Sequence, residues 1–157
     1  MSVFEQFGRW LRRRQGIERN PLYRIASDAA EGRLTVEQAY AAAEHPSTVA
    51  RLADGDLWEV LDEASHLALD RPDQALLLSR LVILAARQKG FDRVLMEANL
   101  RAADILAEYL GPDEDEARET ERQREQELHL QEALRAARRI ANAAGQRRAL
   151  ARLARLA

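Results

Sequence analysis

The chain has 157 residues, a net charge of −2 and no cysteine. This length fits one domain that buries roughly 68–70% of its unfolded surface, so folding requires neither disulfides nor a structural metal. The lack of cysteine excludes thiol chemistry, and the N-terminus lacks the residue order of a secretory signal, so we expect a cytoplasmic protein. Alanine, leucine, arginine and glutamate dominate, while glycines number 7 and prolines 4, which predicts one all-helical domain over residues 1–157.

Charge is distributed unevenly along the chain. Residues 1–24 carry a net charge of +4, and residues 128–157 carry a net charge of +6. Because the whole chain has a net charge of −2, the segment between them has a net charge of −12. Charge blocks on helices are usually solvated faces. We therefore favour an interpretation in which the basic ends fold back onto the acidic body, and an anionic partner for these ends is the alternative.

The first predicted helix begins at the N-terminus. Ser2 and Glu5 have the spacing of a capping box, and Gly16 is expected to end the helix. One face is apolar, comprising Val3, Phe4, Phe7, Trp10 and Leu11. Three arginines, Arg12, Arg13 and Arg14, lie in the last turn, where cations favour the negative end of the helix dipole. We expect this helix to dock onto the domain, and binding to an anionic membrane surface is the alternative.

Two more helices complete the N-terminal part, residues 1–45. Asn20-Pro21 is a favourable start for the second helix, which stops at Gly32. Thr35 and Gln38 form another capping box, and His45-Pro46 ends the third helix. The residues expected to face inward on this third helix are Val36, Ala39, Tyr40 and Ala43.

The middle of the chain, residues 56–110, contains three strongly apolar segments. A loop at residues 54–56 precedes a stripe of inward-facing residues from 57 to 69. Residues 72–89 follow, with only Ser79 and Arg80 interrupting the apolar run from Ala75 to Ala86, so we expect the central buried helix here. A third helix is predicted from residue 91 to residue 110.

The last part, residues 112–157, begins with a stretch of charge. Between residues 112 and 127 the only apolar residue is Ala117, among eight acids and three arginines. We expect residues 113–127 to bury nothing and either to fray or to join residues 128–144 in one helix near thirty residues long. Gly145 is expected to break that helix before a basic C-terminal tail.

A weak internal repeat lies within residues 56–110. At an offset of 34 residues the identical pairs are Val60 and Val94, Leu61 and Leu95, Glu63 and Glu97, Ala64 and Ala98, Ala68 and Ala102, and Asp70 and Asp104. Thirty-four residues is the period of the tetratricopeptide repeat. The segment resembles that family, with Trp58 and Leu61 at the spacing of its Trp and Leu. The resemblance implies stacked helical hairpins, so we expect six to eight helices in a small solenoid of this kind or in an irregular bundle.

No catalytic signature is present, and we predict neither an enzyme nor a cofactor. The chain has no Gly-rich phosphate loop and no strand-turn-helix serine motif. Glu63 and His66 have the Glu-x-x-His spacing of di-iron carboxylate proteins. The comparable stretch ending at His129 has Gln126 where that chemistry needs glutamate, so we do not predict a metal site.

The predicted function is a non-enzymatic protein-interaction or adaptor module that binds another protein or a peptide in a groove between helices. Assembly into a homo-oligomer is compatible with this prediction. The alternative is an arginine-rich protein that binds nucleic acid or a membrane surface through its basic ends. The candidate partner-binding residues are Trp10, Arg12, Arg13, Arg14, Arg147, Arg148, Arg152 and Arg155.

Overall fold

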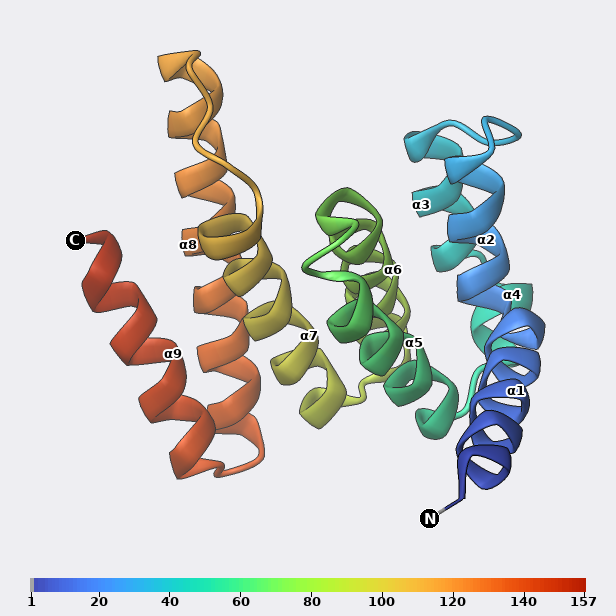
Figure 1. Ribbon diagram of the computed structural model, residues 1–157. Helices are drawn as coiled ribbons and strands as arrows, with labels where there is room; N and C mark the ends of the chain where they lie inside the picture. Colours follow the sequence, from blue (N-terminus) through green and yellow to red (C-terminus); the bar gives the residue numbers. More distant parts are fainter. Residues whose placement is uncertain (1) are drawn as a thin grey trace.

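The computed structural model describes residues 2–157, apart from the side chains of residues 7 and 9–13. It is 82% helical, and its described residues form no strand, which confirms the all-α fold class. Nine α-helices and one π-helix lie within that range, more than the six to eight expected, because a five-residue helix and the π-helix add to the count (Figure 1).

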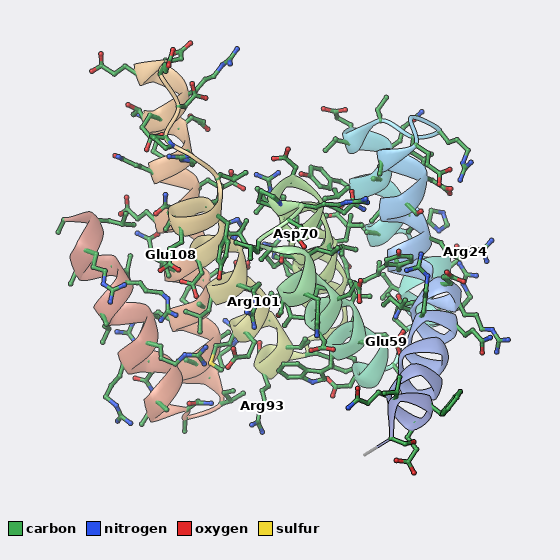
Figure 2. All side chains as sticks on the ribbon, viewed as in Figure 1. Arg24, Glu59, Asp70, Arg93, Arg101 and Glu108 are labelled. Carbon is green, nitrogen blue, oxygen red and sulfur yellow. The ribbon has the colours of Figure 1, made fainter. Side chains whose placement is uncertain are left out.

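Helix α1 (Val3–Arg19) begins with the predicted capping box, in which Ser2 Oγ accepts a hydrogen bond from the Glu5 amide at 3.2 Å. The expected end at Gly16 is wrong. The helix continues because the next residue, Ile17, is buried and 3% exposed, while Gly16 lies inside the helix. A Cβ at Gly16 would come no closer than 3.9 Å to a carboxylate oxygen of Glu59, and Figure 2 shows Glu59 on the side of its helix that faces α1.

Helix α2 (Pro21–Ala30) starts at the predicted Asn20-Pro21 pair. Asn20 Oδ1 accepts from the Leu22 amide at 3.1 Å, while Asn20 Nδ2 donates to the Asp56 carbonyl at 2.9 Å. The amide side chain therefore starts α2 and also fixes it to the beginning of α5. After Ala30 the chain turns through Gly32, whose φ of 78° is left-handed.

Helices α3 (Val36–Glu44), α4 (Pro46–Ala50) and α5 (Asp54–Leu67) follow. The Thr35–Gln38 capping box is confirmed. Two expectations are wrong here. Val36 is 44% exposed rather than inward, because its side of α3 borders a hollow that no other helix fills. Residues 54–56 form the first turn of α5 rather than a loop, because the Asp56 carboxylate accepts the Ala53 amide at 2.8 Å and stabilises that turn.

Helix α6 (Pro72–Lys89) has the predicted bounds and is the centre of the core. It packs against α2, α3, α5 and α7. Its residues Leu78, Leu81 and Val82 have no solvent exposure. Gly90 ends it with a left-handed φ of 70°. The prediction of a central buried helix is confirmed.

Helix α7 (Asp92–Asp104) continues into a five-residue π-helix, Ile105–Tyr109. The four apolar pairs matched at an offset of 34 residues lie on α5 and α7, except that Ala68 is the C-cap residue that follows α5. All eight of these side chains are at most 3% exposed. The two helices thus bury equivalent positions.

Helix α8 (Glu116–Arg139) is 24 residues long and includes most of the charge-only stretch. The expectation that residues 113–127 bury nothing is wrong, since Gln126 is only 7% exposed. Arg122 Nη2 donates to Glu119 at 2.8 Å, and its Nη1 donates to the carbonyls of Leu110 and Gly111. These bonds tie the start of α8 to the end of the preceding helix.

Helix α9 (Ala143–Leu156) follows a break that Gly145 does not cause. Helix α8 ends at Arg139 with Ile140 as its C-cap, and Ala141 adopts a left-handed φ of 52°. Gly145 instead lies buried in the first turn of α9, where a Cβ would collide with Met96 Sδ and lie 3.3 Å from Ala137 Cβ. The glycine allows α9 to cross the preceding helices closely.

The helices form an open, curved row in which neighbours in the chain pack side by side (Figure 1). Helices α3, α6 and α8 run in the same direction. Arg80 of α6 lies beside Tyr40 of α3 and Glu125 of α8, and Arg87, two turns later, lies beside Glu132 of α8. The three parallel helices therefore present equivalent faces on one side of the row.

Candidate functional site

A hollow of about 690 Å³ lies between α3, α6 and α8, and we call it the groove. Each helix contributes residues spaced one or two turns apart, which places them on one face of that helix. The lining residues are Val36, Glu37 and Tyr40 from α3; Arg80, Ile83, Leu84 and Arg87 from α6; and Glu125, Leu128, His129, Glu132 and Arg135 from α8.

Two arginine–glutamate pairs connect α6 with α8 along the groove. Arg80 Nε lies 2.9 Å from Glu125 Oε1. Arg87 binds Glu132 with two hydrogen bonds, of 2.9 Å from Nε and 2.8 Å from Nη2. The two arginines are seven residues apart on α6, and the two glutamates are seven residues apart on α8. Since seven residues make about two helical turns, each arginine lies beside one glutamate on the facing sides of the two helices.

A buried asparagine of α7 joins these pairs from below. Asn99 has no solvent exposure, and its Nδ2 donates to the Leu95 carbonyl at 3.0 Å and to Glu132 Oε1 at 2.9 Å. Both partners are acceptors, so Asn99 Oδ1 must be the atom that lies 2.7 Å from His129 Nδ1. His129 Nε2 faces Glu125 Oε1 at 3.3 Å. Asn99, Glu132, His129 and Glu125 therefore form one continuous polar network.

The carboxylates of the network are held in their ionised form. Burial alone would raise the pKa of Glu125, but hydrogen bonds from His129 and Arg80 outweigh it and lower that pKa below its ordinary value. The same balance lowers the pKa of Glu132, through hydrogen bonds from Arg87 and Asn99. The polar groups at the base of the groove therefore neutralise one another.

Apolar side chains stand exposed on opposite walls of the groove. Leu128 on α8 is 64% exposed and Val36 on α3 is 44% exposed. Between them lie Ile83, which is nearly buried, and Leu84, which is partly buried. Exposed apolar side chains that line one hollow are typical of binding sites rather than of ordinary surface.

Two further charged side chains line the groove outside the arginine–glutamate pairs. Glu37 on α3 and Arg135 on α8 are exposed. Neither has an ion pair among the side chains that the structure describes. They lie on opposite walls, so the groove offers one unneutralised charge of each sign.

The sequence-predicted site residues lie elsewhere. Trp10, Arg12 and Arg13 belong to α1, but their side chains lie outside the described residues. Arg14 is exposed and contacts Glu18 at 3.3 Å. None of the described candidates lines the groove.

On α9, two of the four candidate arginines already pair with α7. Arg148 binds Glu97 at 2.6 Å and 3.1 Å, and Arg152 binds Asp104 at 2.6 Å and 2.9 Å. The other two candidates, Arg147 and Arg155, are exposed. Half of this basic cluster is therefore neutralised within the chain.

The described part of the chain contains neither a cluster of metal ligands nor a membrane-spanning helix. No group of three histidine or acidic side chains in it is placed to hold a metal ion. His66 Nδ1 lies 2.7 Å from the Asp62 carbonyl one turn earlier on α5. None of the described helices is both long and apolar enough to cross a membrane.

Sequence reasoning missed the groove residues, and one signal was present. Arg80 interrupts an apolar helix, Glu125 lies in the acidic stretch, and Glu132 lies in the basic C-terminal segment, so none of the three stands out in the sequence as a site residue. The shared spacing of seven residues between Arg80 and Arg87 and between the two glutamates could have suggested paired faces. Comparison with family models, with curated proteins and with solved structures finds no match for this chain.

Proposed function

We propose that this protein is a non-enzymatic interaction module or adaptor that binds another protein in the groove between α3, α6 and α8. The observation that carries the proposal is the pair of exposed apolar side chains, Leu128 and Val36, on opposite walls of a 690 Å³ hollow. Burial of such side chains is the usual source of affinity in a protein interface.

The polar side chains of the groove favour binding over catalysis. Arg80, Arg87, Glu125 and Glu132 are engaged with one another across the two helices. A catalytic acid or base must be within reach of a substrate proton, whereas these groups are committed to fixing the distance between α6 and α8.

We also propose that the helices form a tetratricopeptide-like array. The equal burial of the offset pairs in α5 and α7 supports this, as does the parallel direction of α3, α6 and α8. Arrays of stacked helical hairpins present concave surfaces of this kind to their partners.

The proposal is tested by affinity capture from the native cell followed by mass spectrometry, with two variants compared. Leu128→Glu places a charge in the groove, and Leu69→Glu places the same charge on a leucine that is 79% exposed outside it. We expect Leu128→Glu to lose a partner that Leu69→Glu retains. Equal capture by both variants would contradict the proposal.

The alternative of nucleic-acid or membrane-surface binding has less support. Arg148 and Arg152 are already paired with Glu97 and Asp104, which reduces the positive charge that α9 offers to a phosphate. The two remaining exposed arginines of α9 give a small electrostatic attraction.

A further inference from the structure

The groove has the length of a short helix. Its α8 wall extends from Glu125 to Arg135, eleven residues, whose first and last Cα atoms are about 15 Å apart at a rise of about 1.5 Å per residue. Its α6 floor extends from Arg80 to Arg87, two turns of helix. An occupant helix of about ten residues would match the length of the α8 wall.

The walls disfavour an extended peptide. They are helices, so their backbone amides and carbonyls are bonded within each helix and none forms a free strand edge. The polar side chains Asn99, His129 and Glu132 are bonded to one another. An extended segment would give up water from its backbone groups without gaining partners, whereas a helix satisfies its own.

The charges define the flanks of the occupant. Glu37 faces it from α3 and Arg135 from α8, and neither has an ion pair among the described side chains. The remaining charged pairs, Arg80–Glu125 and Arg87–Glu132, are neutral as units. A complementary helix carries a basic flank toward α3 and an acidic flank toward α8.

Resting on the proposed function, we infer that the partner of this groove is an amphipathic helix of about three turns. Its apolar face packs against Val36, Leu84 and Leu128, with lysine or arginine on the flank toward Glu37 and aspartate or glutamate on the flank toward Arg135. Reversing such a helix end to end exchanges its flanks, so a given partner binds more tightly in one direction than in the other.

The probe is a designed peptide of fourteen residues, labelled for fluorescence anisotropy. It has leucines at positions i, i+3, i+4 and i+7, lysines on one flank and glutamates on the other. A hydrocarbon staple on the outer face keeps it helical, because isolated helices of this length are marginal in water. Four matched peptides each change one feature. The first contains two prolines, the second has alanines in place of the leucines, the third has lysines on both flanks, and the fourth has glutamates on both flanks.

We expect the mixed-flank peptide to bind and the proline and alanine peptides not to bind. Each mismatched flank should weaken binding by up to about fivefold, the range measured for exposed ion pairs. Glu37→Lys should shift the preference to the peptide with glutamates on both flanks. Arg135→Glu should shift it to the peptide with lysines on both flanks, whereas Arg147→Glu on α9 should leave the preference unchanged.

Folding of the variants is controlled separately, and the oligomeric state of the protein is measured by analytical ultracentrifugation. Each variant is melted by circular dichroism, and Leu128→Glu, which should abolish peptide binding, is compared with Leu69→Glu, which should not affect it. The substituted side chains are exposed on the surface, so we expect the fold to persist.

Several outcomes would overturn the inference. Equal binding of the proline peptide, or unchanged flank preference in both charge variants, would exclude a helix held by these contacts. Leu128-dependent capture of a cellular partner without binding of any peptide would overturn the helical occupant and leave the proposed function standing. A dimer that Leu128→Glu dissociates would identify a second copy as the occupant. If the Leu128→Glu variant still captures the partner and still binds the peptide, both proposals are overturned.

Discussion

The junction between α6 and α8 and the junction between α7 and α9 have similar connections but different surfaces. Each joins two parallel helices that are separated by one helix in the chain, and each is crossed by two arginine–carboxylate pairs. The hollow at the first junction measures about 690 Å³, with α3 as a third wall, and the hollow at the second about 220 Å³.

The difference lies in the side chains around the ion pairs. Helix α9 approaches closely through Gly145, which lies against Met96 and Ala137, and its next turn buries the small side chain of Ala149. Between α6 and α8 the facing positions are instead arginines and glutamates. Small residues close one junction and long charged residues hold the other open, although ion pairs cross both.

The largest expected effect on stability comes from shortening a core side chain of α6. Leu81→Ala at a side chain with no exposure should lower the free energy of unfolding by about 2–5 kcal/mol. Urea denaturation followed by circular dichroism measures this. An unchanged midpoint would show that α6 is peripheral rather than central.

The ion pairs of the two junctions should differ in their contribution to stability. Glu132→Ala leaves Arg87 and the buried Asn99 without a shared acceptor and should cost about 1–3 kcal/mol. Glu97→Ala leaves the half-exposed Arg148 free to bind water and should cost about 0.2–1 kcal/mol. Equal losses in urea denaturation would show that the network around Asn99 adds nothing.

The close packing of α9 is tested by Gly145→Ala. The new Cβ would collide with Met96 Sδ, and the strain exceeds the gain in helix preference, so we expect a net loss on the order of 1 kcal/mol. Gly55→Ala is the matched control, because a Cβ at Gly55 meets nothing within 4 Å. We expect that control to be neutral or slightly stabilising in the same denaturation experiment.

The open junction should also make stability depend on pH. Glu125 and Glu132 have pKa values lowered below their ordinary value of 4.5, so the folded state binds fewer protons than the unfolded state in that range. Their contribution is fully present above about pH 4.5 and is lost as the pH falls through the lowered values. The double variant Glu125→Gln and Glu132→Gln should have a flatter dependence of melting temperature on pH below 4.5, and an unchanged slope would contradict this.

The smallest effect on partner binding is expected at α9. Replacing Arg147, Arg148, Arg152 and Arg155 with glutamine should leave capture of a protein partner largely intact, since none of them lines the groove. If the protein instead binds duplex DNA, the slope of log affinity against log salt should fall by about 0.9 for each lost phosphate contact. Submicromolar DNA binding at physiological salt that this variant loses would favour the alternative function.

The sequence predicted elements whose signals are local. The bounds of α6 followed from Pro72 and Gly90, and two capping boxes located the starts of α1 and α3. The glycines inside α1 and α9 misled the prediction, because a glycine that ends a helix and one that lets another element come close are identical in sequence.

The groove could not be predicted in the same way. The two residues of each α6–α8 pair are 45 positions apart in the chain, and only the packing of α7 between the two helices brings them together. Val36 illustrates the same limit. Its place in an apolar pattern predicted burial, but its exposure depends on where α3 lies relative to α8.

The arginine–glutamate pairs between α6 and α8 have a consequence for the shape of the whole molecule. In a row of stacked hairpins, the small rotation from one hairpin to the next sets the curvature. Because α7 sets the packing distance and the pairs join α6 to α8 on the groove side of it, the pairs favour one bend at the middle of the row. Replacing both glutamates by aspartate shortens each connection by one methylene, so we expect α8 to move toward α6 and the row to bend more sharply.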